Sequence, residues 1–371
     1  MSSVEISVVI PAYNSASLLE LTLAGFANGT ADRDSYEIVV VNDGSSDRTD
    51  EVVASFADDL PLQYIRQYRN MGRAVARNLG IRRASGRVLM FCDADAIPHR
   101  EFVRAHLEHQ RRGEDIVVIG HKRDLLTHWT NTMPREWLIP LLRSGVPDVL
   151  RDKAERAVDG EELYFIERED VAADWRYFDA CTTKREPQPF GTVGENLADV
   201  PVAWSAFVTR NVSVPRSLLD RCGVFDETFE GWGYEDTDLG YRLAQAGAVF
   251  VYAPEAINHH QLHRNPMDWV DAYAQAAQNY RRFIRKHPSF ETYLHWRYFV
   301  GLLDERSFHE LVVTRRAAAA AGHEALVADY DRLSEYMAYA YCDSSDPSTW
   351  GLVRSQEMRL QHRADIVRPK P

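Results

Sequence analysis

The stretch that decides the fold is RVLMFCDADAIP, residues 87–98. Its short apolar run, Val88–Cys92, predicts a buried strand because it is continuous, brief and followed at once by polar residues. Two carboxylates, Asp93 and Asp95, come directly after the run. Ligands of open α/β sheets collect at the carboxyl ends of the strands, and hard divalent cations prefer oxygen ligands. The stretch therefore predicts a site for a cation and its phosphates, although a solvated turn would also be rich in Asp.

Length and composition exclude several classes of protein. The 371 residues are enough for one large domain and a smaller one, and the net charge of -12 argues against a nucleic-acid binder. The four cysteines are scattered without a CxxC pair, which predicts neither a zinc site nor a disulfide framework. We find no signal-type segment and no apolar run long enough for a transmembrane segment, and we therefore expect a cytoplasmic protein.

The N-terminal part alternates between two kinds of segment. Short apolar runs predict strands at Ile6–Ile10, Glu37–Val41 and Leu62–Arg66. Helical periodicity follows each run, ending with Gly72–Ala84 before the strand Val88–Cys92. This alternation predicts βαβ units and an α/β fold with a mostly parallel sheet. The chain has no Walker loop and no GxGxxG fingerprint, which lowers support for ATP-type phosphate binding and for dinucleotide binding.

Two early strand ends carry polar residues that suit a nucleotide base. Asp43, in the turn Asn42-Asp43-Gly44, offers an acceptor for the N3–H group of uracil or thymine. Tyr13 follows the first strand and offers a ring that can lie flat against a base. Taken singly, each residue fits an ordinary turn that binds nothing better than it fits a base-binding site.

The middle of the chain is less regular. Residues 122–202 are rich in charge, Trp, Tyr and Pro, with one helix expected near Val149–Ala157. Such a long irregular segment is usually functional or mobile. Its aromatic residues predict either an apolar platform for an acceptor or a local core: Trp129, Trp137, Trp175 and Tyr177. A strand is expected to follow at Trp204–Thr209.

A second informative stretch, residues 223–247, contains the sequence Gly231-Trp232-Gly233 ahead of a predicted helix. Glu235 and Asp236 come where that helix begins, and carboxylates there are favoured by the helix dipole. Capping is one interpretation of these acids. The glycines around Trp232 favour another, in which Glu235 and Asp236 face an open cleft.

Histidines and helices complete the chain. His259, His260 and His263 follow a last predicted strand at Val249–Tyr252, and we expect one of them to join Asp95 on a metal. From residue 265 onward the sequence is helical, including one helix over Phe308–Cys342. This region is predicted to mediate dimerisation, bind the acceptor or cover the cleft.

Four stretches together resemble family 2 glycosyltransferases of the GT-A fold: VVIPAYN at 8–14, VVVNDGSSD at 39–47, RNMGRAVARNLGIRRASGRVLMFCDAD at 69–95 and GVFDETFEGWGYEDTDLGYRL at 223–243. The last is also similar to the acceptor-side motif of β-1,4-galactosyltransferases and bacterial chondroitin-type polymerases. The resemblance covers roughly Ile6–His263 and implies a GT-A domain over residues 1–264, with an acceptor-side insertion at about 122–202. Residues 265–371 lie outside the resemblance, and we expect them to form a helical C-terminal extension through which a homodimer can form.

The resemblance also implies an activity. It is an inverting, Mn²⁺- or Mg²⁺-dependent transfer of a sugar from a nucleotide-diphosphate sugar, with UDP- or dTDP-sugars favoured. The acceptor would carry a hydroxyl-type group, as a saccharide, natural product, lipid-linked glycan or peptide does. Asp236 would be the general base and Glu235 would bind acceptor hydroxyls. Asp95 would ligate the metal with His260, or with His259 or His263 in its place. The donor would be held by Pro11, Tyr13, Asp43, Arg73, Arg77, Asp93 and Trp232.

Three alternatives compete with this interpretation. A catalytically dead sugar-nucleotide sensor or scaffold would keep the same fold. A sugar-nucleotide pyrophosphorylase would need a Gly-rich, Arg-containing N-terminal loop where this chain has Pro11-Ala12-Tyr13-Asn14. A glycoside hydrolase would use two carboxylates flanking the bond and would leave the base-binding pattern at Tyr13 and Asp43 unexplained.

Overall fold

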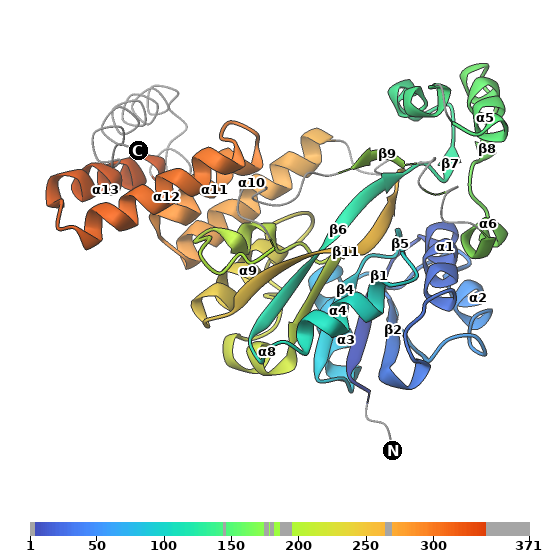
Figure 1. The fold of residues 1–371 in the computed structure, drawn as a ribbon, viewed down its shortest axis with the longest axis horizontal. Helices are drawn as coiled ribbons and strands as arrows, with labels where there is room; N and C mark the ends of the chain where they lie inside the picture. Colours follow the sequence, from blue (N-terminus) through green and yellow to red (C-terminus); the bar gives the residue numbers. More distant parts are fainter. Residues whose placement is uncertain are drawn as a thin grey trace.

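The computed structural model describes residues 4–143, 146–173, 178, 182–185, 195–263 and 269–338. A mixed sheet lies at its centre, with eight strands side by side in the order β3-β2-β1-β4-β10-β6-β11-β5 and with β9 paired to β6 (Figure 1). The strands are β1 Ile6–Ala12, β2 Tyr36–Asn42, β3 Leu62–Arg66, β4 Val88–Cys92, β5 Ala96–Pro98, β6 Ile116–Leu125, β9 Thr182–Arg185, β10 Asn211–Pro215 and β11 Val249–Gln261.

The N-terminal half of the sheet is parallel, as predicted. Strands β3, β2, β1 and β4 pair in parallel, and β11 pairs in parallel with β6. Strand β10 runs antiparallel between β4 and β6. Helices cover the sheet, and their bounds are α1 Ala16–Ala27, α2 Thr49–Ala54, α3 Arg73–Arg83, α4 Phe102–Gln110, α8 Arg216–Cys222 and α9 Glu235–Gln245. The parallel strands β1, β2 and β4 are therefore buried on both faces, which explains their continuous apolar sequences.

Two expected elements differ in the structure. The predicted strand at Trp204–Thr209 is wrong, because Ala203–Ala206 forms a short 3₁₀ helix, η4, whose Trp204 turns into a core shared with later helices. The last strand was expected to end at Tyr252, but β11 continues to Gln261 along β6, with a register shift between Ala253 and Ile257. Two of the histidines predicted to follow this strand, His259 and His260, therefore lie within it.

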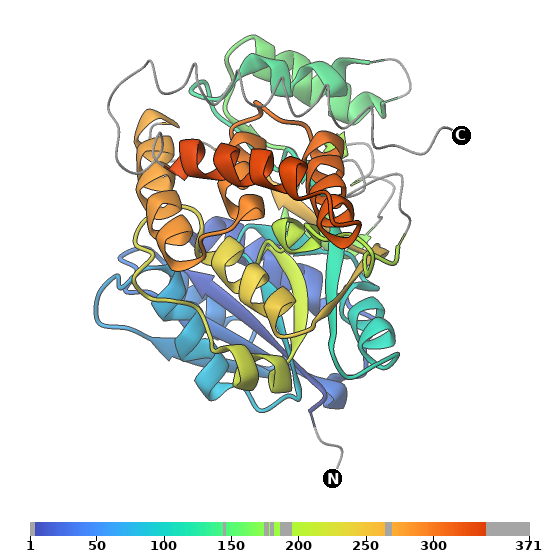
Figure 2. The same ribbon diagram turned by 90° about the vertical axis from the view of Figure 1, so that its left-hand side faces the viewer.

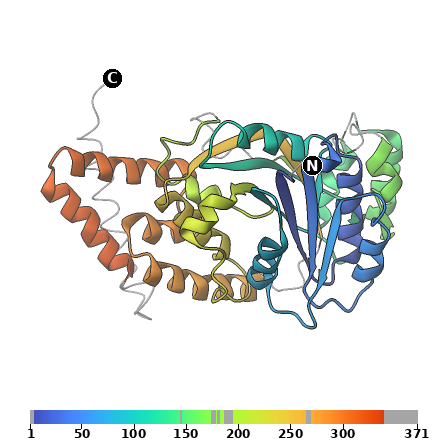
Figure 3. The same cartoon turned by 90° about the horizontal axis from the view of Figure 1, so that it is seen from below.

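Within the segment 122–202, residues 128–173 form small elements at one end of the molecule (Figures 1 and 3). They are β7 His128–Trp129, η2 Arg135–Trp137, η3 Ile139–Leu142, α5 Asp148–Val158, β8 Leu163–Tyr164 and α6 Arg168–Ala173, of which α5 was predicted. Trp129 is 1% exposed and belongs to the same apolar cluster as α1, with Trp137 packed against it. The core interpretation holds for these two residues, while Trp175 and Tyr177 lie outside the described part.

Four helices extend from the opposite end: α10 Trp269–Lys286, α11 Phe290–Phe299, α12 Glu305–Ala320 and α13 Glu324–Ala338 (Figure 3). The single helix predicted from Phe308 onward is thus two helices in the described residues. Figure 2 shows these helices next to α9, with the sheet beyond. Their apolar side chains share one cluster with η4, α9 and the sheet. In the described part of the chain, none of the helices combines the length and the apolar character needed to cross a bilayer.

Trp204 is the centre of this shared core, and its replacement is our first prediction. Its ring is 2% exposed and contacts Tyr241 of α9, Phe283 of α10 and Phe308 of α12. We expect Trp204→Ala to lower the free energy of unfolding by about 3–5 kcal/mol, because a large cavity forms between η4 and the helices. Chemical denaturation measures this loss. Leu302→Ala, at a side chain 64% exposed, is the control, and an equal loss in both variants would contradict the shared core.

Candidate active site

The ends of β1 and β2 form a polar corner. Asp43 donates its backbone N–H to the carbonyl of Ala12, so the two loops lie side by side. The Asp43 carboxylate accepts the N–H groups of Met71 and Gly72 at 2.8 and 2.9 Å and the Gln67 amide at 2.7 Å. Burial raises the pKa of this carboxyl, and the two backbone donors partly offset the effect. Asp43 therefore fixes the loop that leads into α3, in addition to any contact with a base.

Tyr13 lies at the edge of this corner with its side chain 50% exposed. It follows Pro11 and Ala12 at the end of β1, and the next residue, Asn14, has a positive φ of 47°. Asn14 is tied to the β2 loop, because its side chain accepts the N–H of Ser46 at 2.8 Å. The Tyr13 ring is therefore exposed beside a fixed loop, and its stacking on a base stays a prediction.

A second polar cluster lies after the end of β4 and consists of Asp95, His260 and His263. Their ligand atoms lie within 4.8 Å of one another. One oxygen of Asp95, Oδ2, is 2.9 Å from Nε2 of His263 and 3.6 Å from Nε2 of His260. The other, Oδ1, is buried with no hydrogen-bond partner. A carboxylate, two imidazoles and an unsatisfied buried oxygen fit a divalent cation.

Strand β6, which pairs with β11, carries a carboxylate that contacts the second ring nitrogen of His260. Nδ1 of His260 lies 3.3 Å from Asp124 of β6, which also pairs with Lys122 at 2.9 Å. Burial opposes ionisation of Asp124, but the hydrogen bond from His260 and the charge of Lys122 outweigh it and lower the pKa to about 2. A carboxylate on the far nitrogen of a histidine is the usual support for a metal ligand. Sequence reasoning missed Asp124, because it lies 136 residues before His260.

His259 is separated from this cluster by the alternation of the strand. It pairs with Ile97 of β5 in the backbone ladder, and its buried ring contacts Phe178. Successive strand residues point to opposite faces, so His259 and His260 cannot serve the same ion. Of the three candidate histidines, His260 and His263 are the ones the structure brings to Asp95.

One guanidinium joins the acid that follows β4 to the two acids at the start of α9. Arg77 of α3 is buried, with Nη2 3.2 Å from Asp93 and Nη1 3.1 and 3.4 Å from Glu235 and Asp236. The pKa of Arg77 rises further above its ordinary range, because the three carboxylates outweigh the cost of burial. These contacts show that Arg77 holds the three acids together.

Asp236 is held by a residue that the sequence did not reveal. Its carboxylate accepts the backbone N–H of Thr209 at 3.0 Å and the Thr209 hydroxyl at 3.0 Å from both oxygens. Burial raises the pKa of Asp236 to about 6, against the lowering effect of Arg77. A carboxylate with this pKa can accept a proton near neutral pH.

Glu235 does not face an open cleft in the structure. It is 3% exposed, at the first turn of α9, and Oε1 lies 3.9 Å from Nε of Arg73 in addition to the Arg77 contact. The sequence placed both acids correctly at the helix start, but it could not show that a buried arginine covers Glu235. Arg73 keeps nearly half of its side chain exposed beside this acid.

Trp232 lies in a loop that α10 holds in place. Gln275 of α10 accepts the Trp232 N–H at 3.0 Å, and Asn279 donates to the carbonyls of Glu230 and Gly233 at 2.9 Å each. The Trp232 ring contacts Tyr273 of α10. The helical region thus supports the loop that precedes Asp236, which no local sequence signal indicated.

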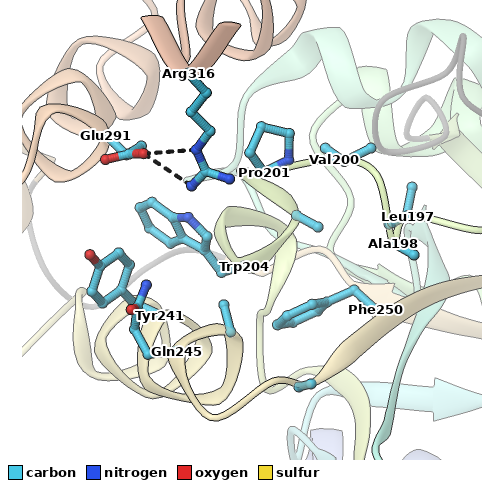
Figure 4. Close-up of a pocket in the computed structure, with 13 residues that line it drawn as sticks. Leu197, Ala198, Val200, Pro201, Trp204, Tyr241, Gln245, Phe250, Glu291 and Arg316 are labelled. Atoms are coloured by element: carbon cyan, nitrogen blue, oxygen red, sulfur yellow. Dashed lines mark hydrogen bonds and ion pairs between the residues drawn. The ribbon is translucent and has the colours of Figure 1, made fainter. Parts of the chain in front are cut away.

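A pocket of about 280 Å³ lies at the far end of α9 (Figure 4). Arg316 of α12 reaches into it beside Trp204 and pairs with Glu291 at 3.0 Å. Tyr241 and Gln245, from the C-terminal half of α9, line another side. None of the predicted site residues borders this pocket, so it is separate from the acid cluster.

Comparisons with known proteins show the family of this chain. The model of "Glycosyl transferase family 2" matches residues 7–163, and the model described as "N-terminal domain of galactosyltransferase" matches residues 192–264. An uncharacterized glycosyltransferase of Bacillus subtilis, YfnE, is 30% identical over 76% of this chain and 73% of its own length. The chain belongs to glycosyltransferase family 2.

Other relatives share only part of their length with this family 2 chain. Validoxylamine A glucosyltransferase of Streptomyces hygroscopicus subsp. jinggangensis is 34% identical over 78% of this chain and 63% of its own length. Chondroitin synthase of Escherichia coli is 29% identical over 69% of this chain and 34% of its own length. The match thus covers less than two thirds of both relatives.

Solved structures show the fold of this family 2 chain. S. aureus TarS 1-349 in complex with UDP-GlcNAc has a TM-score of 0.52 at 15% identity, with 78% of this chain and 66% of that chain covered. Mannosyltransferase PcManGT from Pyrobaculum calidifontis, in complex with GDP-Man and Mn2+, has a TM-score of 0.50 at 21% identity, with 97% and 86% covered. The GT-A fold that the sequence predicts is confirmed.

Proposed function

We propose that this protein transfers a sugar from a nucleotide-diphosphate sugar to an acceptor hydroxyl, with inversion at the anomeric carbon and with a divalent cation. The observation that carries the proposal is the Arg77 bridge, because it unites Asp93 at the end of β4 with Asp236 at the start of α9. The acids proposed for the donor and for the acceptor would thereby serve one reaction site. A protein that only bound a sugar nucleotide would not need the two acids at the start of α9.

The donor would lie across the strand ends. The base would stack on Tyr13 and meet Asp43, while Pro11 shapes the end of β1. Asp93 would bind the ribose or water on the cation, and Arg73 would approach the diphosphate. Trp232, held by Gln275, would close the donor site from the α9 side. A UDP- or dTDP-sugar suits the acceptor atom that Asp43 offers, and the relatives named as glucosyltransferases favour glucose as the sugar.

Asp95, His260 and His263 would hold the cation. When bound, Mn²⁺ or Mg²⁺ supplies positive charge that stabilises the negative charge developing on the departing diphosphate. The chain's own contribution is to fix the three ligands at a strand end and to orient His260 through Asp124. Asp95 of this cluster is two residues from Asp93 in the sequence, which supports a diphosphate site beside the residues proposed for the donor.

The transfer step forms one bond to the anomeric carbon and breaks another. The acceptor oxygen bonds to that carbon while the bond from the carbon to the diphosphate oxygen breaks. The electron pair of the broken bond leaves with the nucleotide diphosphate, and the acceptor proton passes to the Asp236 carboxylate. Attack from the face opposite the leaving group inverts the carbon. Glu235 would bind a second acceptor hydroxyl once its contacts with Arg77 and Arg73 rearrange.

A nucleotide-release assay tests the proposal. Purified protein is incubated with UDP-glucose, UDP-GlcNAc, dTDP-glucose or GDP-mannose in the presence of Mn²⁺, Mg²⁺ or EDTA. We expect slow hydrolysis of one donor that EDTA abolishes and that a saccharide or natural-product acceptor accelerates. Donor binding by calorimetry without release under any acceptor would favour a sensor. Release of nucleoside triphosphate from a donor and pyrophosphate would favour a pyrophosphorylase.

The raised pKa of Asp236 leads to a second prediction. A base must be ionised to accept a proton, so the rate should be full above a pH of about 6 and fall as pH drops through that value. We expect kcat/KM of the best donor to decline about tenfold for each pH unit below the acid limb. The profile is measured at saturating Mn²⁺, with metal occupancy checked at each pH. An unchanged rate at pH 5, with the metal still bound, would exclude Asp236 as the base.

A further inference from the structure

We propose that Thr209 is a positioning residue that orients the Asp236 carboxylate toward the acceptor and keeps it ionised. This inference rests on the proposed function, since it concerns the same base. It assigns a role in the reaction to the turn between η4 and β10, which carries none of the site residues predicted from the sequence.

The contacts of Thr209 single it out. Two donors from this one residue, the backbone N–H and the side-chain hydroxyl, reach the same carboxylate at 3.0 Å. Thr209 is 1% exposed, so water does not compete for these bonds. Hydrogen bonds to a charged acceptor are stronger than those between neutral groups. Together the two donors fix both the position and the rotation of the carboxylate plane.

The turn that carries Thr209 is pressed against the helix that carries Asp236. A side chain at Gly240 of α9 would lie 2.6 Å from the carbonyl oxygen of Trp204 and 2.7 Å from Cβ of Phe207. The glycine therefore permits an approach that other residues would prevent. Because Trp204 is buried among α9, α10 and α12, the turn has little freedom to withdraw from Asp236.

The charged groups around Asp236 cannot replace the two neutral donors of Thr209. Arg77 comes from α3 and is shared with Asp93, after β4, and with Glu235, the neighbour on α9. The two carboxylates work against ionisation of Asp236, and Arg77 works in its favour. Among the residues that the structure describes, Thr209 is the hydrogen-bond partner that acts on Asp236 without being divided among the three acids. Its hydroxyl should therefore affect the acid limb of the rate directly.

The test compares Thr209→Val, Thr209→Ser and Thr209→Ala by the pH dependence of donor hydrolysis, using the donor turned over fastest in the presence of Mn²⁺. Loss of the hydroxyl should move the acid limb upward by about one pH unit and lower kcat about tenfold, with donor KM unchanged. Thr209→Ser keeps the hydroxyl and should retain the wild-type profile. If Thr209→Val does not fold, the Ser and Ala variants, which both lack the methyl group, still differ by the hydroxyl alone.

A second readout does not depend on turnover. The carboxylate resonance of Asp236 in ¹³C-aspartate-labelled protein, assigned by its loss in Asp236→Asn, should titrate at a higher pH when the hydroxyl is removed. An unchanged titration and an unchanged acid limb would overturn the role of Thr209. That outcome is distinct from failure of the proposed function, in which Asp236→Asn itself would leave the reaction intact. In the Asp236→Asn background, Thr209→Val should have no further effect on kcat.

Discussion

Asp236→Asn is expected to lower the rate of sugar transfer by about 10²–10⁴-fold, the range that a positioned general base contributes. Asparagine has nearly the same shape, and its carbonyl oxygen can still accept a hydrogen bond from Thr209, so the site should keep its geometry. What it loses is the ability to take the acceptor proton. Donor binding, measured by calorimetry with the nucleotide diphosphate and Mn²⁺, should therefore stay within about threefold of wild type.

The same substitution should not weaken the fold at neutral pH. Folding raises the pKa of the Asp236 carboxyl from its ordinary value to about 6, so the folded chain holds this proton more tightly than the unfolded chain does. Ionising the group inside the fold therefore costs stability as pH rises from about 4 to about 6, and Asn removes that cost. We expect thermal melting at pH 7 to be unchanged or higher. Asp271→Asn, on the exposed face of α10, is the control, and transfer within about tenfold of wild type in Asp236→Asn would refute the base assignment.

The sequence predicted the sheet best where the signal was local. The apolar runs of β1, β2 and β4 predicted parallel strands because each run is short, buried on both faces and bounded by polar residues. Trp204–Thr209 has the same apolar character, but its largest ring packs against helices that lie more than thirty residues away. Tertiary packing decides the structure there, and periodicity alone does not contain that information.

The residues of the candidate site also differ in whether a local sequence signal predicts them. The sequence predicted four acids at the candidate site because strand ends and helix starts can be located from local patterns: Asp93, Asp95, Glu235 and Asp236. The partners that tune these acids were not. Asp124 meets His260 across 136 residues and Thr209 meets Asp236 across 27, and neither belongs to a motif. Such contacts follow from the extension of β11 along β6 and from the packing of η4 on α9, both of which depend on the whole fold.

The second large effect is expected at the cation cluster. Asp95→Ala and His263→Ala should each lower the affinity for Mn²⁺ at least about 100-fold, because each removes a ligand where even supporting residues contribute about 10–100-fold. Mn²⁺ binding is followed by the electron paramagnetic resonance signal of the free ion, with and without UDP. This readout does not require turnover or a known acceptor. Donor hydrolysis should fall in parallel, since the diphosphate loses the charge that stabilises its departure.

Variants at two residues near the ligands test whether the cation site has the geometry of the structure. Asp124→Asn keeps every ligand and removes the charge behind His260, so it should weaken Mn²⁺ binding about tenfold. His259→Ala removes the imidazole on the opposite face of β11 and should leave Mn²⁺ affinity unchanged in the folded fraction. A loss in His259→Ala equal to that in His263→Ala would show that β11 does not present its histidines as the structure has them. Wild-type affinity in Asp95→Ala would mean that the cation binds elsewhere, and the buried Oδ1 of Asp95 would then need another explanation.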